Sequence, residues 1–132
     1  MADPHFTVAE ANALLPTVRQ LVERMVEHRR ELGAALERRQ ALGELTGSNG
    51  GGFNPRFPAE VDDADEQAAE GIKQCVEELT ALGVQVKDLD AGLVDFPSTR
   101  DDEDVLLCWQ LGEDEIGWWH TLDGGFAGRR PL

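Results

Sequence analysis

Apolar residues separated by alternating four- and three-residue steps run through the first third of the chain, and this pattern constrains the fold most strongly. The stripe consists of Leu14, Val18, Leu21, Met25, His28, Leu32, Ala35 and Leu42. This spacing predicts an amphipathic helix within residues 1–45, and Thr7 with Glu10 is the signature of an N-terminal capping box. We expect a kink or a restart at Pro16, because proline removes a backbone donor.

A second amphipathic segment at residues 61–83 can cover that helix. Its apolar stripe consists of Val61, Ala64, Ala68, Ile72, Cys75, Leu79 and Leu82. Acidic residues fill its first turn, where they interact favourably with the positive end of the helix dipole. Gly83 is a typical residue at a helix C-terminus. The glycine-rich residues 46–60 lack the preceding strand and the lysine of a phosphate-binding loop, so we interpret them as a flexible connector. Two stripes joined in this way predict an antiparallel helical hairpin.

Beyond Gly83 the apolar residues alternate instead of following a helical period. Residues 84–87, 93–97, 105–111 and 116–120 are short strand candidates, separated by clusters of turn-forming residues. Residues 84–132 are therefore expected to form a small antiparallel β-meander with a C-terminal tail. Packed on the helical hairpin, the meander predicts a single domain of the α+β class.

The lengths of the turns predict the strand register, if each turn has an even number of residues. The expected pairs are Val94–Trp109, Asp95–Cys108, Phe96–Leu107, Leu107–His120, Trp109–Trp118 and Leu111–Ile116. Because side chains alternate, the helix-facing side would carry Val94, Phe96, Val105, Leu107, Trp109, Leu111, Ile116, Trp118 and His120. The other face would carry Leu93, Asp95, Leu106, Cys108, Gln110, Gly117 and Trp119. A slip of one residue would exchange the two faces.

The chain is strongly acidic, with 26 Asp and Glu against 12 Lys and Arg in 132 residues and a net charge of −14. Residues 1–58 carry seven acids and seven arginines, so residues 59–132 carry the whole charge. Such acidity argues against nucleic acid and anionic membranes as partners. No secretory signal opens the sequence, so we expect a cytoplasmic protein whose two cysteines are reduced.

Two histidines, His28 and His120, fall on surfaces expected to face inward, where each needs a hydrogen-bonding partner or a metal ion. Zinc takes three or four ligands, often from closely spaced pairs, and the sequence offers no such pair. A metal site would have to be assembled from distant residues, and the candidates are His120, Glu113, Asp95 and Glu10. Cys108 is expected on the opposite face of the sheet from His120. A neighbouring carboxylate would raise the pKa of the Cys108 thiol. We therefore expect a structural role for Cys108.

Several short motifs together resemble those of the uncharacterised bacterial domain-of-unknown-function family 2203. They are Phe6-Thr7, Glu10-Ala11-Asn12, Leu14-Leu15-Pro16, Lys87-Asp88-Leu89-Asp90, Gly92-Leu93-Val94-Asp95-Phe96-Pro97, Leu107-Cys108-Trp109, Leu111-Gly112-Glu113, Trp119-His120, Gly125-Phe126 and Arg129. The resemblance covers nearly the whole chain and implies no established activity. It implies that the family signature includes Lys87, Asp88, Asp95, Cys108, Trp109, Glu113, His120 and Arg129.

These observations leave two functional hypotheses. The first is a noncatalytic homodimeric domain that binds a partner or a small ligand through the second sheet face and the end of the sheet. Its candidate ligand-binding residues are Lys87, Asp88, Asp95, Trp109, Glu113, His120 and Arg129. The alternative is a metal-binding protein, or a small enzyme that depends on a divalent metal ion, with His120 as a ligand or general base.

Overall fold

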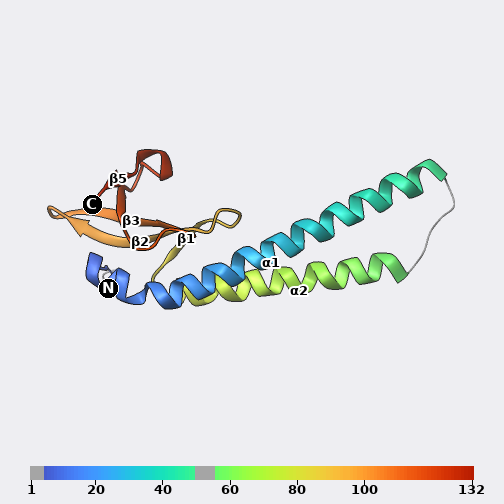
Figure 1. Ribbon diagram of the computed structural model, residues 1–132, viewed down its shortest axis with the longest axis horizontal. Helices are drawn as coiled ribbons and strands as arrows, with labels where there is room; N and C mark the ends of the chain where they lie inside the picture. Colours follow the sequence, from blue (N-terminus) through green and yellow to red (C-terminus); the bar gives the residue numbers. More distant parts are fainter. Residues whose placement is uncertain (1–4, 50–55) are drawn as a thin grey trace.

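The computed structural model describes residues 5–49 and 56–132, with side chains for residues 5–34 and 65–132. Two long helices, α1 (Val8–Asn49) and α2 (Arg56–Ala81), form the predicted antiparallel hairpin (Figure 1). Both helices extend further into the connector than the sequence predicted. Pro58 lies in the first turn of α2, where its missing N–H is not needed. The rest of the predicted connector, residues 50–55, lies outside the described residues.

The start of α1 follows the predicted capping box. The Thr7 amide donates to Glu10 Oε1 at 3.0 Å, and the Glu10 amide donates to Thr7 Oγ1 at 3.1 Å. The pKa of the Glu10 carboxyl is lowered, first by the hydrogen bond from the Thr7 backbone amide and then by one from the Thr7 side chain. The helix continues through Pro16 without the predicted restart, with Leu15 and Val18 buried and Pro16 facing solvent.

The strands are β1 (Gln85–Asp88), β2 (Leu93–Arg100), β3 (Glu103–Gln110), β4 (Trp118–Thr121) and β5 (Arg130–Pro131), with a short 3₁₀ turn, η1 (Phe126–Gly128). They form one antiparallel sheet in chain order, which confirms the meander and the α+β class. The strand β5 and the turn η1 lie in the segment predicted as a tail. Among the described residues, no helix has the length and apolar character needed to span a membrane.

The β2–β3 register agrees with the prediction. Asp95 pairs with Cys108 and Phe96 with Leu107. The hairpin closes with a two-residue turn, residues 101–102, in which both residues have positive φ, as the twist of a tight hairpin requires.

The predicted β3–β4 register is wrong by one residue. Cys108 pairs with Trp118, and Leu106 pairs with His120. The connection is not a simple four-residue turn, because residues 111–117 do not pair between β3 and β4. Within this connection, Ile116 is buried in the core and its amide donates to the side chain of Asn12 in α1 at 2.8 Å. The shift exchanges the two faces of β4.

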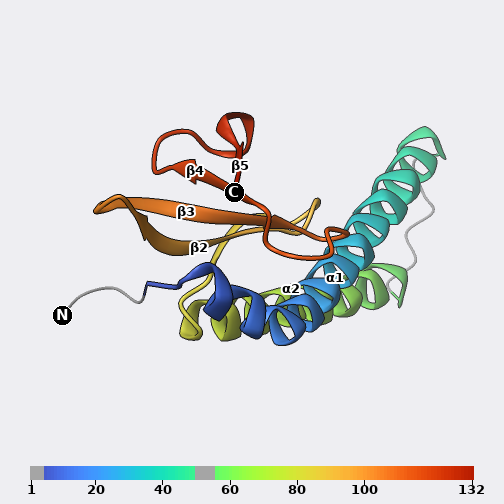
Figure 2. The ribbon, with the colours of Figure 1, turned by 60° about the vertical axis from the view of Figure 1, so that its left-hand side comes forward.

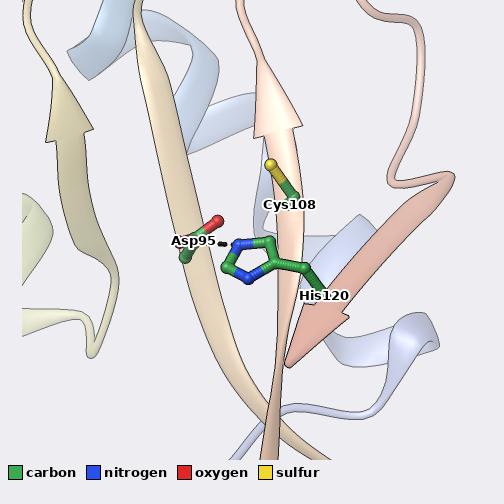
Figure 3. A group of neighbouring side chains, drawn as sticks. All are labelled: Asp95, Cys108 and His120. Carbon is green, nitrogen blue, oxygen red and sulfur yellow. Dashed lines mark ion pairs between the residues drawn. The ribbon is translucent and has the colours of Figure 1, made fainter. Parts of the chain in front are cut away.

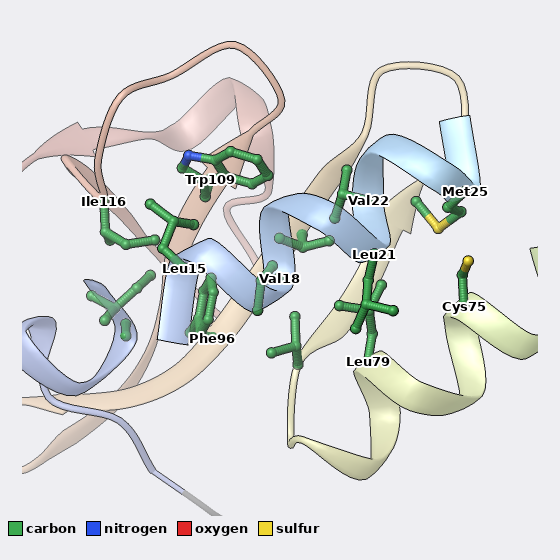
Figure 4. Packing of buried hydrophobic residues seen from close by; sticks show 14 of the residues in the cluster. Leu15, Val18, Leu21, Val22, Met25, Cys75, Leu79, Phe96, Trp109 and Ile116 are labelled. Atoms are coloured by element: carbon green, nitrogen blue, oxygen red, sulfur yellow. The ribbon is translucent and has the colours of Figure 1, made fainter. Parts of the chain in front are cut away.

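The core lies between one face of the sheet and one end of the helical hairpin, and the hairpin projects well beyond the sheet (Figures 1 and 2). Figure 4 shows side chains of α1, α2 and the strands packed together at this end. The fully buried large members of this cluster are Val18, Val22, Met25, Leu79, Val84, Val94, Phe96 and Trp109.

Gly92, in the turn just before β2, allows the sheet to approach α1 closely, and it provides a test of this packing. It has φ of +69°, and an added Cβ would lie 2.9 Å from both Leu111 Cβ and Val22 Cγ1. We expect Gly92→Ala to lower the free energy of unfolding by about 2–4 kcal/mol, through backbone strain and overpacking. Urea unfolding measures this change. Gly117→Ala is the control, since nothing lies within 4 Å of its added Cβ, and an equal loss in both variants would contradict the proposed packing.

Candidate metal centre

Three side chains from neighbouring strands converge on the sheet face away from the helices: Asp95 of β2, Cys108 of β3 and His120 of β4 (Figure 3). One carboxylate oxygen, the thiol sulfur and one ring nitrogen all lie within 4.8 Å of one another. The register explains this meeting, since Asp95 stands directly opposite Cys108. His120 stands opposite Leu106, two residues from Cys108 and therefore on the same face.

The expectation that Cys108 and His120 point to opposite faces is therefore wrong. It depended on pairing Leu107 with His120, and the observed register places Trp119 at that position instead. Trp119 packs against the core, while His120 lies on the other face beside Asp95. A displacement of one residue in one strand is enough to assemble this cluster.

The His120 ring is held at both nitrogens. Nδ1 lies 2.7 Å from the carbonyl oxygen of Thr121, and because a carbonyl only accepts, Nδ1 carries a proton. Nε2 lies 3.0 Å from Oδ2 of Asp95. Both ring nitrogens of His120 therefore have a hydrogen-bonding partner. Nε2 is the nitrogen at which a metal ion would replace a proton.

Cys108 does not have the properties of a nucleophile. Burial, and then the Asp95 carboxylate, raise the pKa of its thiol to about 12, against the opposing effect of Arg129. The thiolate is the reactive form, so this thiol reacts poorly at neutral pH while it stays buried. A base would need a free ring nitrogen directed at the sulfur, and both nitrogens of His120 have other partners. The geometry therefore does not form a cysteine–histidine catalytic pair.

The same three residues suit a transition-metal ion. Oδ1 of Asp95 is buried without a hydrogen bond of ordinary geometry, although the Cys108 thiol lies close enough to interact with this carboxylate. A cation would supply the missing partner. The Thr121 carbonyl fixes the tautomer of His120 that leaves Nε2 for a metal, as is usual around metal-bound histidines. A carboxylate and a thiolate together also supply the two negative charges that balance a divalent ion.

Glu113 and Arg129 form a second group beside this cluster. Nη2 of Arg129 donates to both carboxylate oxygens of Glu113, at 2.6 and 2.9 Å, and to the carbonyl of Cys108 at 3.4 Å. Its guanidinium also stacks on the rings of Trp118 and Phe126. Glu113 is therefore connected to the cluster through Arg129.

The remaining candidates lie elsewhere and have local partners. Oδ1 of Asp88 accepts from the amides of residues 90 and 91 in the β1–β2 turn, and Lys87 is exposed on β1. Trp109 lies in the core and donates from Nε1 to the Glu113 carbonyl at 3.1 Å. Glu10 caps α1.

The other inward-facing histidine, His28, packs against Gly71 where α1 and α2 meet. Its Nδ1 lies 3.5 Å from a carboxylate oxygen of Glu31, one turn along the same helix. It has no place in the Asp95–Cys108–His120 cluster.

Sequence reasoning missed Cys108 as a metal-binding candidate, although it predicted that Cys108 pairs with Asp95. The signal that would have found it is this pairing combined with the correct register of β4. The Thr121 carbonyl, which orients His120, leaves no signal in the side-chain pattern.

The fold and the cluster define a small α+β protein with a buried aspartate–cysteine–histidine group on its sheet. Residues 5–132 match the family model described as "Uncharacterized conserved protein (DUF2203)", and the chain belongs to this family. Neither a curated protein nor a solved structure matches the chain.

Proposed function

We propose that the protein binds one divalent transition-metal ion, of the class of Zn²⁺, through Asp95, Cys108 and His120. The observation that carries this proposal is the meeting of three potential ligand atoms within 4.8 Å inside the protein. A buried polar cluster of this kind costs folding free energy, and well-packed apolar residues would stabilise the same position at least as well. A bound ion would explain why these polar residues occupy a buried position, which packing alone does not explain.

The donor set favours a transition metal over calcium or magnesium. The thiolate and imidazole are ligands typical of zinc and its neighbours, whereas calcium and magnesium take oxygen ligands. Three protein ligands leave a fourth position for water. Because all three side chains are buried, we propose a noncatalytic, structural or sensing role for the ion.

Cobalt(II), which takes the same ligands as zinc, gives a direct test. We expect titration of the wild-type protein with Co²⁺ to produce a sulfur-to-cobalt charge-transfer band that saturates at one equivalent, and Zn²⁺ to remove it. Cys75→Ser is the matched control and should keep the band, since Cys75 lies in the helix–sheet core. If the folded protein gives no charge-transfer band, the proposal is contradicted.

We also keep the homodimer and the cytoplasmic location as proposals. Leu122, Phe126 and Leu132 are exposed large apolar residues of the C-terminal segment, which favours a protein contact there. The second sheet face offers less support than expected, because Leu106, Asp95 and Cys108 are already buried within one chain. Two free, buried cysteines favour a reducing compartment. Sedimentation at high micromolar concentration tests the dimer.

A further inference from the structure

The proposed metal ligands are closed off from solvent. Asp95 is 1% exposed, Cys108 0% and His120 2%. On one side of the sheet the helix–sheet core blocks any path. On the other side lies the C-terminal segment, residues 122–132, and Figures 1 and 2 both show η1 and β5 on the side of β2–β3 away from the helices. We call this segment the C-terminal strap.

The strap has few attachments to the rest of the protein. The strand β5 pairs with β4 through two residues only, Arg130 and Pro131, and the Leu132 amide donates to the Gly117 carbonyl at 3.0 Å. The turn η1 contains no buried residue. Segments with little buried apolar surface and few backbone hydrogen bonds are those that open locally while the rest of a protein stays folded.

Arg129 is the side chain of the strap that contacts the cluster. It is 12% exposed and is held by the carboxylate of Glu113, which is 26% exposed. Its third acceptor is the carbonyl of Cys108, one of the proposed ligands. Glu113 is itself fixed, since its Oε1 accepts from the Gln110 amide at 2.7 Å. Arg129 and Glu113 thus join the strap to the strand that carries Cys108.

We propose that the C-terminal strap is a gate, latched by Arg129 and Glu113, which must open before a metal ion reaches or leaves Asp95, Cys108 and His120. The inference rests on the proposed metal site for the identity of the ion. The gating itself is a property of the metal-free chain as well, because the strap limits the access of any solute to Cys108.

The first test uses thiol alkylation in metal-free Cys75→Ser protein, in which Cys108 is the remaining cysteine. We expect Arg129→Gln and Glu113→Gln each to raise the alkylation rate on the order of ten- to a hundredfold, as the loss of a charge-assisted hydrogen bond implies. Arg130→Gln is the control within the strap: Arg130 stacks on Trp119 but is not part of the latch, so its rate should rise by less than about fivefold, as the loss of an exposed cation–π contact implies. Urea unfolding of each variant separates local opening from loss of global stability.

An alkylation rate that is the same in both latch variants and the wild type would overturn the gate. So would acceleration that merely follows the loss of global stability. Two latch variants are used because they remove opposite partners of one contact, so a single misfolded variant does not decide the result.

The second test measures cobalt exchange by the charge-transfer band, with a chelator to capture released Co²⁺. A gate changes only the barrier, so both association and dissociation should accelerate in the latch variants while the dissociation constant stays the same. Faster dissociation with unchanged association would mean that Arg129 holds the ion in place, which contradicts gating. If the wild type binds no cobalt, the proposed function fails, whereas the alkylation rates still decide whether the strap is a gate.

Discussion

Asp95→Ala is expected to lower the free energy of unfolding of the metal-free protein by about 3–5 kcal/mol, the usual cost of removing one partner of a buried ion pair. In the wild type, Oδ2 of Asp95 lies 3.0 Å from Nε2 of His120. In the variant this ring nitrogen faces a cavity instead. The ring cannot turn to solvent, because it is buried and its Nδ1 is bonded to the Thr121 carbonyl. Urea unfolding at neutral pH, with a chelator present, measures the loss.

A double-mutant cycle with His120→Phe shows whether the pair causes this loss. In the His120→Phe background, Asp95→Ala no longer leaves a buried ring nitrogen without its partner, so it should cost clearly less than in the wild type. Equal costs in the two backgrounds would show that Asp95 stabilises the protein in another way. The cycle therefore isolates the coupling between the two side chains.

Cys108→Ser is expected to abolish the cobalt charge-transfer band and to weaken Zn²⁺ binding by at least about a hundredfold, more than the loss of an outer partner of a metal ligand. A serine hydroxyl occupies nearly the same space but is a much poorer ligand for zinc-class ions. Cys75→Ser, which removes the other buried thiol, should leave both the band and the affinity unchanged. Titration of the two variants under identical conditions makes the comparison.

Serine variants with equal affinities for zinc would contradict this assignment. The same holds if Cys108→Ser keeps the band, because the sulfur at the metal would then belong to Cys75. The circular dichroism spectrum of each variant establishes that it is folded before any affinity is compared.

The class of fold followed from the sequence because its determinants are local. The stripe from Leu14 to Leu42 and the change of period after Gly83 each depend on neighbouring residues. Both predicted the hairpin and meander that the structure shows. The β2–β3 register was also local, since it depends on a two-residue turn.

The β3–β4 register was not predictable in this way, because it depends on one contact far apart in sequence and on one local side-chain contact that turn length does not reveal. The Ile116 amide is bonded to Asn12 of α1, and the Trp109 ring is bonded to the Glu113 carbonyl. Together these contacts hold residues 111–117 as an irregular loop. An inference from turn length alone therefore placed His120 on the wrong face.

That one error explains how much of the candidate site was predicted. His120 was chosen because the predicted register placed it facing inward, where a buried histidine needs a partner, and Asp95 because the family resemblance includes it. Cys108 was assigned a structural role because the predicted register separated it from His120. The net charge of −14 did not point to the site, which contains a single acidic residue, Asp95.

Equilibrium dialysis of tag-free protein against Zn²⁺ tests the central claim most directly. The proposed site predicts one bound ion per chain in the wild type and none in folded His120→Ala at the same free zinc concentration, since the variant lacks the ring nitrogen of the site. A folded wild-type protein that binds no zinc, or a His120→Ala variant that binds as much as the wild type, would contradict it.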